Sequence, residues 1–516
     1  MRWSHRVMVL TAIPIVTSCV WIVQGGSIER ILPESMTTPQ RVESPMKAFL
    51  LDGSTVVYER GGFITFDSVQ GEGTRYAVGT LEPTSIGSIA LDSVVGIEAF
   101  QGRVYGGASF LATVAATALG VVATAALMVA IFGSCPTFYG SAEQGGLLQA
   151  EAFSYSIAPL LEGRDLDALR VVPDADGVLR LELRNEALET HYINELDLVS
   201  VDHPPETRAL PDDRGMPVAV RGEAQPRGAH DRDGTDVLSA LTASDDHHFA
   251  SSEERIRSAS GLDDRDFIEL TFDRPAGEEG VLVLQLRNSL LTTVLFYDMM
   301  LGRAGAGAVD WIGRDLSRIG TVAQLGRWFQ DAMGLRVQVL RDGQWVEVGR
   351  VPDTGPIAWE EVGIRIPLPD SGPVRIRLSF FTDAWRIDRV SLGHPEEPTS
   401  TVRLPPARVE DERRLLPPDA LALLAEPDER YLATYPGTSV MLEFDPPPVR
   451  PGLGRSYLLS SQGYYTEWVR SEWIRNAERV ETFEPGADTV ETLMRLWLAK
   501  RQAFEEQFYS SRIPVR

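Results

Sequence analysis

Two neighbouring strands are predicted by residues 335–348, which read LRVQVLRDGQWVEV. Apolar and polar residues alternate on both sides of the turn RDGQ (341–344), and Asp-Gly is favoured in tight hairpin turns. Residues 374–380 (VRIRLSF) alternate in the same way, and residues 385–392 (WRIDRVSL) end the run. Short alternating strands at this spacing are typical of a β-sandwich. We therefore expect a sandwich over residues 306–395.

A second series of strands precedes this unit. Residues 178–185 (VLRLELRN) alternate cleanly after the turn signal DADG at 174–177. Further short apolar runs follow at 196–201, 267–272 and 281–286. We expect a first sandwich over residues 133–305. Residues 204–265 are rich in Pro, Gly, Asp and Ser, so we interpret them as a long loop of that sandwich.

The two ends of the chain differ from this central part. Residues 47–107 predict a small, barrel-like β domain, because short strands recur about every ten residues. Residues 25–46 are polar and contain proline, so we interpret them as a tether. Residues 396–516 begin as a Pro-rich linker, continue with short strands and end in amphipathic helices. The last helix carries an apolar stripe made of Leu493, Leu496, Trp497, Phe504 and Phe508.

Residues 108–132 form an apolar run without a single charge. A membrane core about 30 Å thick needs roughly 20 apolar residues of helix, so the run predicts one transmembrane helix. A ridge of small side chains follows it at four-residue spacing, made of Ala112, Ala116, Gly120 and Thr124. Such a ridge favours self-association or a protein partner in lipid. Two alternatives stay open: chance spacing in an Ala-rich segment, and a helix buried in a water-soluble core.

Residues 1–24 are typical of an export signal. A short basic region precedes the apolar run 7–16. The ending VTSC (16–19) resembles a bacterial lipobox, and this resemblance implies that Cys19 becomes the lipidated first residue of the mature protein. Apolar residues continue through 20–23, so an uncleaved anchor helix is one alternative. A buried N-terminal helix of a cytosolic protein is another.

Together these segments predict a mainly β fold. Its parts are a small N-terminal β domain, one transmembrane helix, two tandem β-sandwiches and a helical C-terminal tail. The end of the second sandwich, residues 385–392, resembles the closing strand of galactose-binding-like jelly rolls. This likeness concerns the fold and implies no ligand.

Composition excludes several classes of function. The 516 residues carry a net charge of −24, and the pI is near 4.8. A nucleic-acid partner needs a basic surface, so none is expected, and electrostatic binding to anionic lipid is disfavoured. Cys19 and Cys135 are the two cysteines of the chain, which is too few for a disulfide scaffold or the usual zinc sites. No phosphate-binding loop, serine-hydrolase elbow or zinc-protease motif occurs, and we expect no cofactor and no metal.

Three groups of polar side chains are candidates for metal binding or acid–base catalysis. Residues 245–248 (DDHH) offer metal ligands, but adjacent side chains rarely face one ion, so we interpret them as a solvated loop. Residues 231–236 (DRDGTD) resemble the start of a calcium loop without its distal glutamate, and a polar turn is the simpler interpretation. His191 with Glu189 and His203 offers an acid–base pair, although no nucleophile is in view. We therefore assign no catalytic residue.

Aromatic residues near the C-terminus and one cysteine complete the candidates. Tyr464, Tyr465 and Trp468 offer a surface that would bind a sugar or a peptide. The alternative is that they form a core where the last helices pack on the second sandwich. Cys135 has no basic neighbour in sequence to lower its pKa, so we expect it to be buried rather than reactive.

A Ser-Cys-Pro-x-x-Tyr segment, residues 134–139, follows the apolar run. It occurs together with the segments LRNE (183–186), ETHY (189–192), VDHP (201–204), YPG (435–437), RSYLL (455–459) and GYYTEW (463–468). In these features the chain resembles an uncharacterised family of bacterial envelope proteins or lipoproteins. The resemblance covers residues 130–300 and 430–475, and it implies no activity.

We therefore expect a membrane-anchored protein of the bacterial cell envelope, at the inner rather than the outer membrane. Its expected role is non-catalytic binding or scaffolding, with the membrane and a protein partner or second copy as partners. The alternative is an envelope hydrolase or carbohydrate-active enzyme with dispersed carboxylates, which a carboxylate dyad in an aromatic cleft would favour. Flanking charges do not decide on which side of the membrane residues 133–516 lie.

Overall fold

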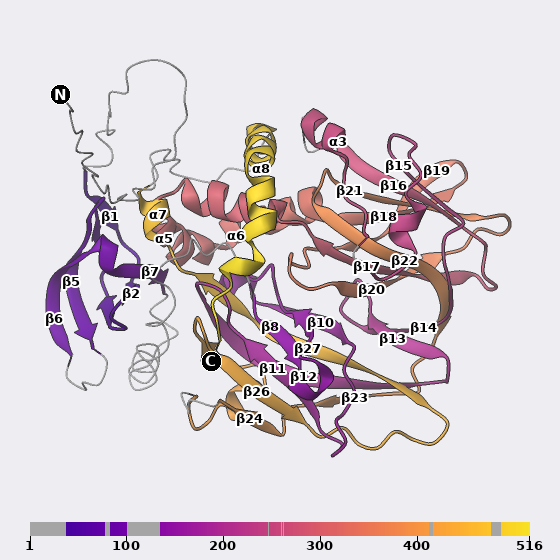
Figure 1. The fold of residues 1–516 in the computed structure, drawn as a ribbon, viewed down its shortest axis with the longest axis horizontal. Coiled ribbons are helices and arrows are strands. Elements are labelled where there is room, and N and C mark those ends of the chain that lie inside the picture. Colours follow the sequence, from indigo (N-terminus) through magenta and orange to yellow (C-terminus); the bar gives the residue numbers. More distant parts are fainter. Residues whose placement is uncertain are drawn as a thin grey trace, which may run out of the picture.

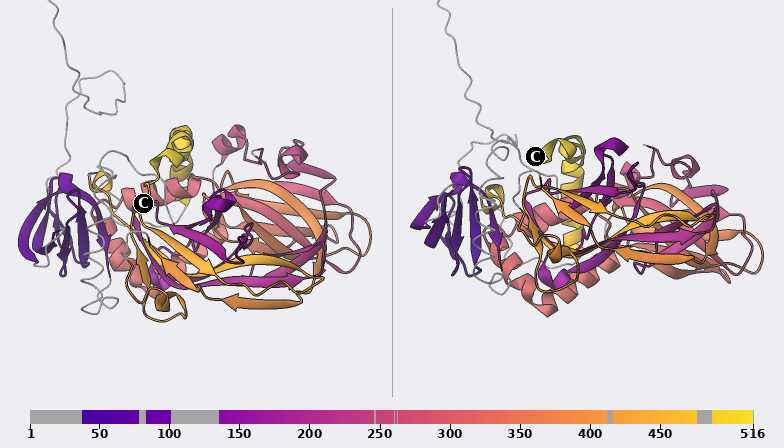
Figure 2. Two further views of the ribbon diagram at one scale, coloured as in Figure 1. Left: turned by 60° about the horizontal axis from the view of Figure 1, so that its bottom comes forward. Right: turned by 90° about the horizontal axis from the view of Figure 1, so that it is seen from below.

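The computed structural model describes residues 38–77, 83–100, 135–245, 247–259, 261, 263–411, 416–475 and 487–515. Over these residues the chain is mainly β-structure, as predicted, with a helical segment beside the sheets (Figure 1). Figure 2 shows the N-terminal sheet at one end of the molecule and the second sandwich at the other. The long helix α8 (Ala487–Gln507) stands between them.

A seven-stranded antiparallel sheet forms the N-terminal domain, in the order β1-β4-β5-β3-β2-β7 with β6 on β5. The predicted small β domain is therefore present. It starts earlier than expected, because part of the predicted tether 25–46 pairs within the sheet. The elements are β1 (Gln40–Val42), β2 (Met46–Leu50), β3 (Thr55–Tyr58), β4 (Gly62–Ile64), β5 (Ser68–Tyr76), β6 (Thr84–Ala90), η1 (Leu91–Ser93) and β7 (Val94–Ala99).

Two five-stranded sheets enclose the core of the first sandwich. One has the order β10-β27-β12-β23 with β25 also on β12, and the other has the order β24-β26-β11-β8-β9. The elements are β8 (Thr137–Gly140), η3 (Ala142–Gln144), β9 (Leu148–Glu151), η4 (Pro159–Leu161), β10 (Gly163–Leu169), β11 (Leu179–Arg184), β12 (Glu189–His203), β23 (Ser400–Leu404), β24 (Arg408–Glu410), η9 (Ala422–Leu424), β25 (Leu432–Thr434), β26 (Ser439–Phe444) and β27 (Gly454–Glu467).

The second sandwich pairs the sheets β13-β14-β22-β17-β20 and β15-β16-β21-β18-β19. The predicted hairpin is confirmed as β18 and β19, and Asp342 and Gly343 between them have φ values of 50° and 78°, which suit a tight hairpin turn. The elements are β13 (Thr207–Pro211), β14 (Pro217–Ala224), β15 (Gly228–Asp231), η5 (Leu238–Leu241), α3 (Glu253–Ser258), β16 (Arg265–Phe272), β17 (Glu279–Asn288), β18 (Leu335–Arg341), β19 (Gln344–Val351), β20 (Glu360–Pro367), β21 (Val374–Phe381) and β22 (Trp385–Glu396).

The second sandwich is inserted into the first, which corrects the tandem arrangement predicted from sequence. Strand β12 ends just before β13, and the chain returns to pair with it at β23. The predicted boundary between 305 and 306 is wrong, because β16 pairs with β21 and β17 with β22 across it. The predicted loop 204–265 is also wrong, because it contains three strands and a helix. Turn-forming residues in the sequence indicated where strands end, but they did not indicate which strands pair.

A helical segment lies between β17 and β18, where the prediction had only strands. Its first part, residues 291–301, is apolar on nearly all sides and almost entirely buried, so it shows no amphipathic stripe that would identify a helix. Its elements are α4 (Leu291–Val294), η6 (Leu295–Gly302), α5 (Gly307–Gly313), η7 (Asp315–Ser317), α6 (Ile319–Trp328) and η8 (Phe329–Met333).

The helical C-terminal tail is confirmed over α7 (Ser471–Ile474), α8 and η10 (Tyr509–Ser511). Four residues of the predicted apolar stripe are buried, namely Leu493, Trp497, Phe504 and Phe508. Trp497 donates a hydrogen bond from Nε1 to Asp383 Oδ2 at 2.8 Å. The strands that precede α7 are not part of a separate tail, because they complete the first sandwich.

The predicted export signal 1–24 with Cys19 lies outside the described residues, as does the predicted transmembrane helix 108–132. The same holds for the ridge on that helix, made of Ala112, Ala116, Gly120 and Thr124. Among the helices of the described ranges, none is both long and apolar enough to cross a membrane. Membrane attachment therefore stays a prediction from the sequence.

Candidate functional site

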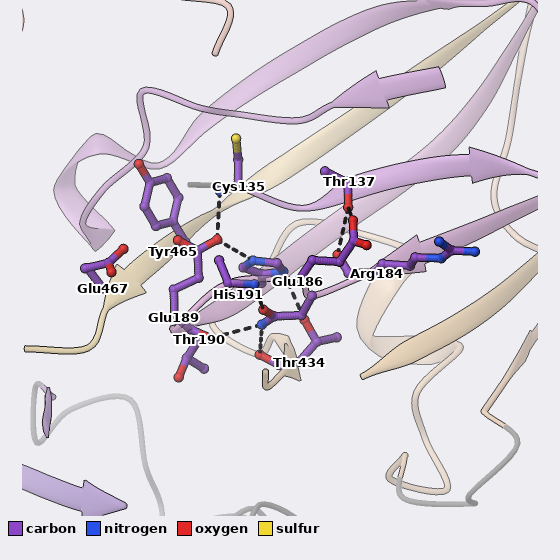
Figure 3. Close-up of polar contacts among 12 residues, drawn as sticks. Cys135, Thr137, Arg184, Glu186, Glu189, Thr190, His191, Thr434, Tyr465 and Glu467 are labelled. Atoms are coloured by element: carbon purple, nitrogen blue, oxygen red, sulfur yellow. Dashed lines mark hydrogen bonds and ion pairs between the residues drawn. The ribbon is translucent and has the colours of Figure 1, made fainter. Parts of the chain in front are cut away.

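A buried polar cluster surrounds Cys135, directly before strand β8 (Figure 3). The backbone N–H of Cys135 donates to Glu189 Oε1 at 2.8 Å, and His191 Nε2 lies 2.7 Å from the same oxygen. His191 Nδ1 lies 3.1 Å from the Thr434 hydroxyl. The Cys135 thiol donates to Glu151 Oε1 at 2.9 Å. The fold therefore brings a cysteine to the predicted Glu189–His191 pair, which sequence spacing did not indicate.

Burial shifts the pKa of both the imidazole and the thiol of this cluster. Burial lowers the pKa of His191 to about 3, so its ring is neutral. Burial, and then the neighbouring carboxyls of Glu151 and Glu189, raise the pKa of the Cys135 thiol. A protonated thiol is a poor nucleophile. We interpret the cluster as a structural junction between β8, β9 and β12.

A second buried pair continues the cluster towards the helices. Arg470 donates to Glu467 Oε1 at 2.6 Å, and its guanidinium lies 4.5 Å from the ring centre of Tyr297 and 4.8 Å from that of Trp473. Burial, and then the carboxyl of Glu189, raise the pKa of Glu467, while Arg470 opposes this rise. These contacts hold the end of β27 against the helical segment.

Stability is expected to depend on pH through Glu151. Burial raises the pKa of Glu151 from 4.5 to about 8, so between these values the folded protein binds more protons than the unfolded chain. Stability should therefore fall as pH rises from about 4.5 to 8, by up to about 1.4 kcal/mol per pH unit for one such group. Glu151→Gln should flatten this fall, measured by urea unfolding at several pH values. Equal slopes in both proteins would contradict the assignment.

A cleft of about 440 Å³ opens where the two sandwiches meet the helical segment. Its volume lies in the range of small-molecule sites, about 300–1,000 Å³. Its lining comes from the residues after β9, from α6 and η8, and from the turn between β19 and β20. The apolar and aromatic lining consists mainly of Tyr155, Ile157, Leu160, Leu161, Leu325 and Phe329. Such a lining suits a ligand with an apolar body.

A smaller cavity of about 40 Å³ adjoins the inner end of the cleft. The two share Ile157, Phe329 and Asp353 in their linings. The smaller cavity also reaches Tyr297 and Tyr465, which are both buried. Asp353 is therefore the carboxylate that both spaces have in common.

The two carboxylates of the cleft differ in how far their oxygens are already engaged. Glu162 accepts three hydrogen bonds, from Asn194 at 2.8 Å, Tyr431 at 2.7 Å and Gln462 at 3.0 Å. Asp353 Oδ1 accepts from the backbone N–H of Gly355 at 2.9 Å, and the Ser154 hydroxyl lies 3.5 Å away. Within the described part of the chain, Oδ2 of Asp353 makes no hydrogen bond. Asp353 is therefore the carboxylate with capacity for a ligand.

The predicted aromatic surface of Tyr464, Tyr465 and Trp468 does not exist as a surface, because all three side chains are buried. Tyr464 stacks on Tyr192 with ring centres 4.7 Å apart. Trp468 stacks on Phe49 of the N-terminal domain at 3.8 Å. Tyr465 lies at the inner cavity and donates from its hydroxyl to a backbone carbonyl at 3.1 Å. The alternative of a core is right in that the three residues are buried, but they lie on and directly after β27 of the first sandwich and not where the last helices meet the second sandwich.

The remaining polar candidates lie apart from one another. His203 is buried beside the Ser456 hydroxyl at 3.0 Å, whereas His247 is exposed. Asp231 Oδ1 accepts from the backbone N–H groups of Asp233 and Thr235, which is a local polar turn. Over the described ranges, no group of three or more His, Cys, Asp or Glu is arranged to hold a metal ion.

No protein-family model and no curated protein matches the chain. Among solved structures, it is similar to BuGH86wt in complex with neoagarooctaose, with 8% identity and a TM-score of 0.15, over 44% of this chain and 33% of that chain. It is also similar to a GH31 alpha-xylosidase from Xanthomonas citri, with 11% identity and a TM-score of 0.14, over 61% of this chain and 29% of that chain. The chain thus spans about a third of the length of these proteins. Likeness this low carries no argument about function.

The lining of the cleft was not predicted from the sequence. Tyr155, Phe329 and Asp353 come from a loop of the first sandwich, the helical segment and a turn of the second sandwich. One local signal was present: residues 352–356 read PDTGP and interrupt two strand patterns. Such a turn is equally common on any protein surface, so it identifies a loop and not a site.

Proposed function

We propose that this is a non-catalytic binding protein of the bacterial cell envelope, and that the cleft at Asp353 is its ligand site. The observation that carries the proposal is a cleft of about 440 Å³ with apolar walls and one carboxylate oxygen that is not engaged. Largely preformed clefts with few polar groups are typical of small-molecule sites. The site lies where the two sandwiches meet the helical segment, so its lining comes from three separate parts of the fold.

Attachment to the membrane is the part of the proposal that depends on the sequence alone. It is supported by the export-signal pattern of residues 1–24 and the uncharged run 108–132. The ridge on that run favours a second copy or a protein partner in the membrane. This protein would then be anchored in the membrane, and its cleft would bind the ligand close to the membrane surface.

Hydrolysis is less well supported by the same cleft. A glycosidase of the common kind needs two carboxyl groups that are free to act on opposite sides of one bond. Of the two carboxylates here, Glu162 already accepts hydrogen bonds from three side chains. The buried Cys135 cluster does not favour hydrolysis either, because burial raises the pKa of its thiol and lowers the pKa of its imidazole.

Filling the cleft should weaken binding without disturbing the fold. Gly326 lines the cleft on α6, and a side chain there would enter open space. Gly326→Phe should therefore weaken binding of small aromatic compounds by about tenfold or more, or about 1.4 kcal/mol. Replacing a helix-interior glycine also favours the helix. The measurement is ligand-observed NMR with neutral, anionic and cationic monocyclic aromatic compounds.

A matched control lies on the same helix. Gly320 also faces open space but does not line the cleft, so Gly320→Phe should leave binding unchanged. The proposal fails if none of the compound classes binds the unmodified protein. It also fails if the two variants bind the compounds equally well.

A further inference from the structure

The cleft offers negative and aromatic groups but no cation. Its polar side chains are Glu162, Gln330, Asp353 and Tyr155, whose hydroxyl donates to the Arg164 carbonyl at 3.0 Å, and no Arg, Lys or His is present among the described residues that line it. Asp353 forms no ion pair with any described residue, and Oδ1 takes both of its neutral donors. Its second oxygen, Oδ2, would therefore accept a hydrogen bond from a ligand.

Further carboxyl groups lie near Tyr155. Asp165, Asp167 and Glu360 all raise the pKa of the Tyr155 hydroxyl, after the larger effect of burial. Asp167 is 3% exposed, and neither of its carboxylate oxygens has a hydrogen-bond partner. No ion pair links these three carboxyls to an Arg or Lys within the described ranges. Burial raises the pKa of these three carboxyls and of Asp353, and an ammonium group placed beside Asp353 would lower the pKa of that carboxyl again.

We infer that the cleft binds an organic amine, with its ammonium group on Asp353 and its apolar body between Tyr155 and Phe329. This inference rests on the proposed function, and it names the chemical class of the ligand. A charge-assisted hydrogen bond is stronger than a neutral one. Tyr155 and Phe329 line the same cleft as Asp353, and an aromatic face attracts a cation. An anionic ligand would meet unfavourable carboxylates instead.

Three probes of similar shape test the inference: 2-phenylethylammonium, 2-phenylethanol and 3-phenylpropionate. The unmodified full chain should bind the ammonium compound about tenfold or more tightly than the alcohol, and it should bind the carboxylate weakest. Affinities are measured by ligand-observed NMR titration at pH 7. This comparison needs no variant, so it does not depend on a mutant that folds.

Asp353→Asn provides the second arm of the test. The asparagine oxygen can keep the hydrogen bonds from Gly355 and Ser154 while the charge is lost, so the preference for the ammonium compound should fall by about tenfold. Asp342→Asn, in the exposed turn of the β18–β19 hairpin, makes the same charge change elsewhere and should keep the preference.

The outcomes separate the inference from the proposed function. Equal binding of the alcohol and the ammonium compound, or an Asp353→Asn variant with unchanged preference, would overturn the amine inference while the cleft stays a ligand site. The same holds if only the carboxylate compound binds. Failure of every probe class to bind, or binding that Gly326→Phe does not weaken, would remove the proposed function itself.

Discussion

Replacing Trp468 by alanine should destabilise the protein by about 3–5 kcal/mol. The side chain is fully buried and stacks on Phe49 with ring planes 9° apart. Its Nε1 donates to the hydroxyl of Thr190 at 2.9 Å. The variant loses the buried ring and leaves a cavity between the N-terminal domain and the first sandwich. It also leaves the buried Thr190 hydroxyl without this donor.

The measurement is the free energy of unfolding from denaturant titration, compared with Phe66→Ala. Phe66 is a large apolar residue of the N-terminal region but is 42% exposed, so its replacement should cost about 0.5 kcal/mol or less. If Trp468→Ala lowers the free energy of unfolding no more than Phe66→Ala does, then Trp468 is not buried between the N-terminal domain and the first sandwich. An exposed aromatic surface, the prediction from sequence, would then regain support.

Replacing Lys47 by methionine should have an effect of similar size, about 3–5 kcal/mol. Lys47 Nζ lies 3.2 Å from Glu98 Oε2, and the two side chains are 1% and 0% exposed. The Tyr192 hydroxyl donates to the other oxygen of Glu98. Removal of Lys47 leaves a negative charge buried without its cation, because methionine restores only the apolar volume.

The double variant Lys47→Met, Glu98→Gln separates lost charge pairing from lost packing. It should be more stable than Lys47→Met alone, since a neutral amide replaces the unpaired carboxylate and still accepts from Tyr192. Arg60→Met is the control, because Arg60 pairs with Glu72 at 3.8 Å and both are largely exposed. It should cost about 1 kcal/mol or less. A double variant no more stable than Lys47→Met would contradict the buried ion pair.

Local patterns predicted the strands well. The hairpin at 335–348 and the strand at 374–380 are present, because alternation of apolar and polar residues and a turn signal act over a few residues. The stripe on helix α8 is also confirmed, since one apolar face packs against the rest of the molecule. Residues 291–301 escaped prediction as a helix because they are buried on nearly all sides and show no period.

These local patterns did not predict which distant strands pair with each other. Strand β12 pairs with β27, which lies more than two hundred residues later, and the second sandwich is inserted between them. A half-buried strand has the same alternation whichever neighbour it has, so the boundary at 305 and the loop at 204–265 were wrong. The same limit applies to Tyr464, Tyr465 and Trp468, because a large aromatic residue is equally suited to a core and to a binding surface.

The sequence by itself determined that this chain is acidic, mainly β and without a familiar catalytic motif, since composition and short-range periodicity carry that information. Tertiary structure alone decided where polar groups meet. It brought Cys135 to Glu189, Lys47 to Glu98, and Tyr155, Phe329 and Asp353 to one cleft. The physical reason is that these contacts join residues far apart in the chain, and they arise only when whole sheets and helices pack their apolar faces together.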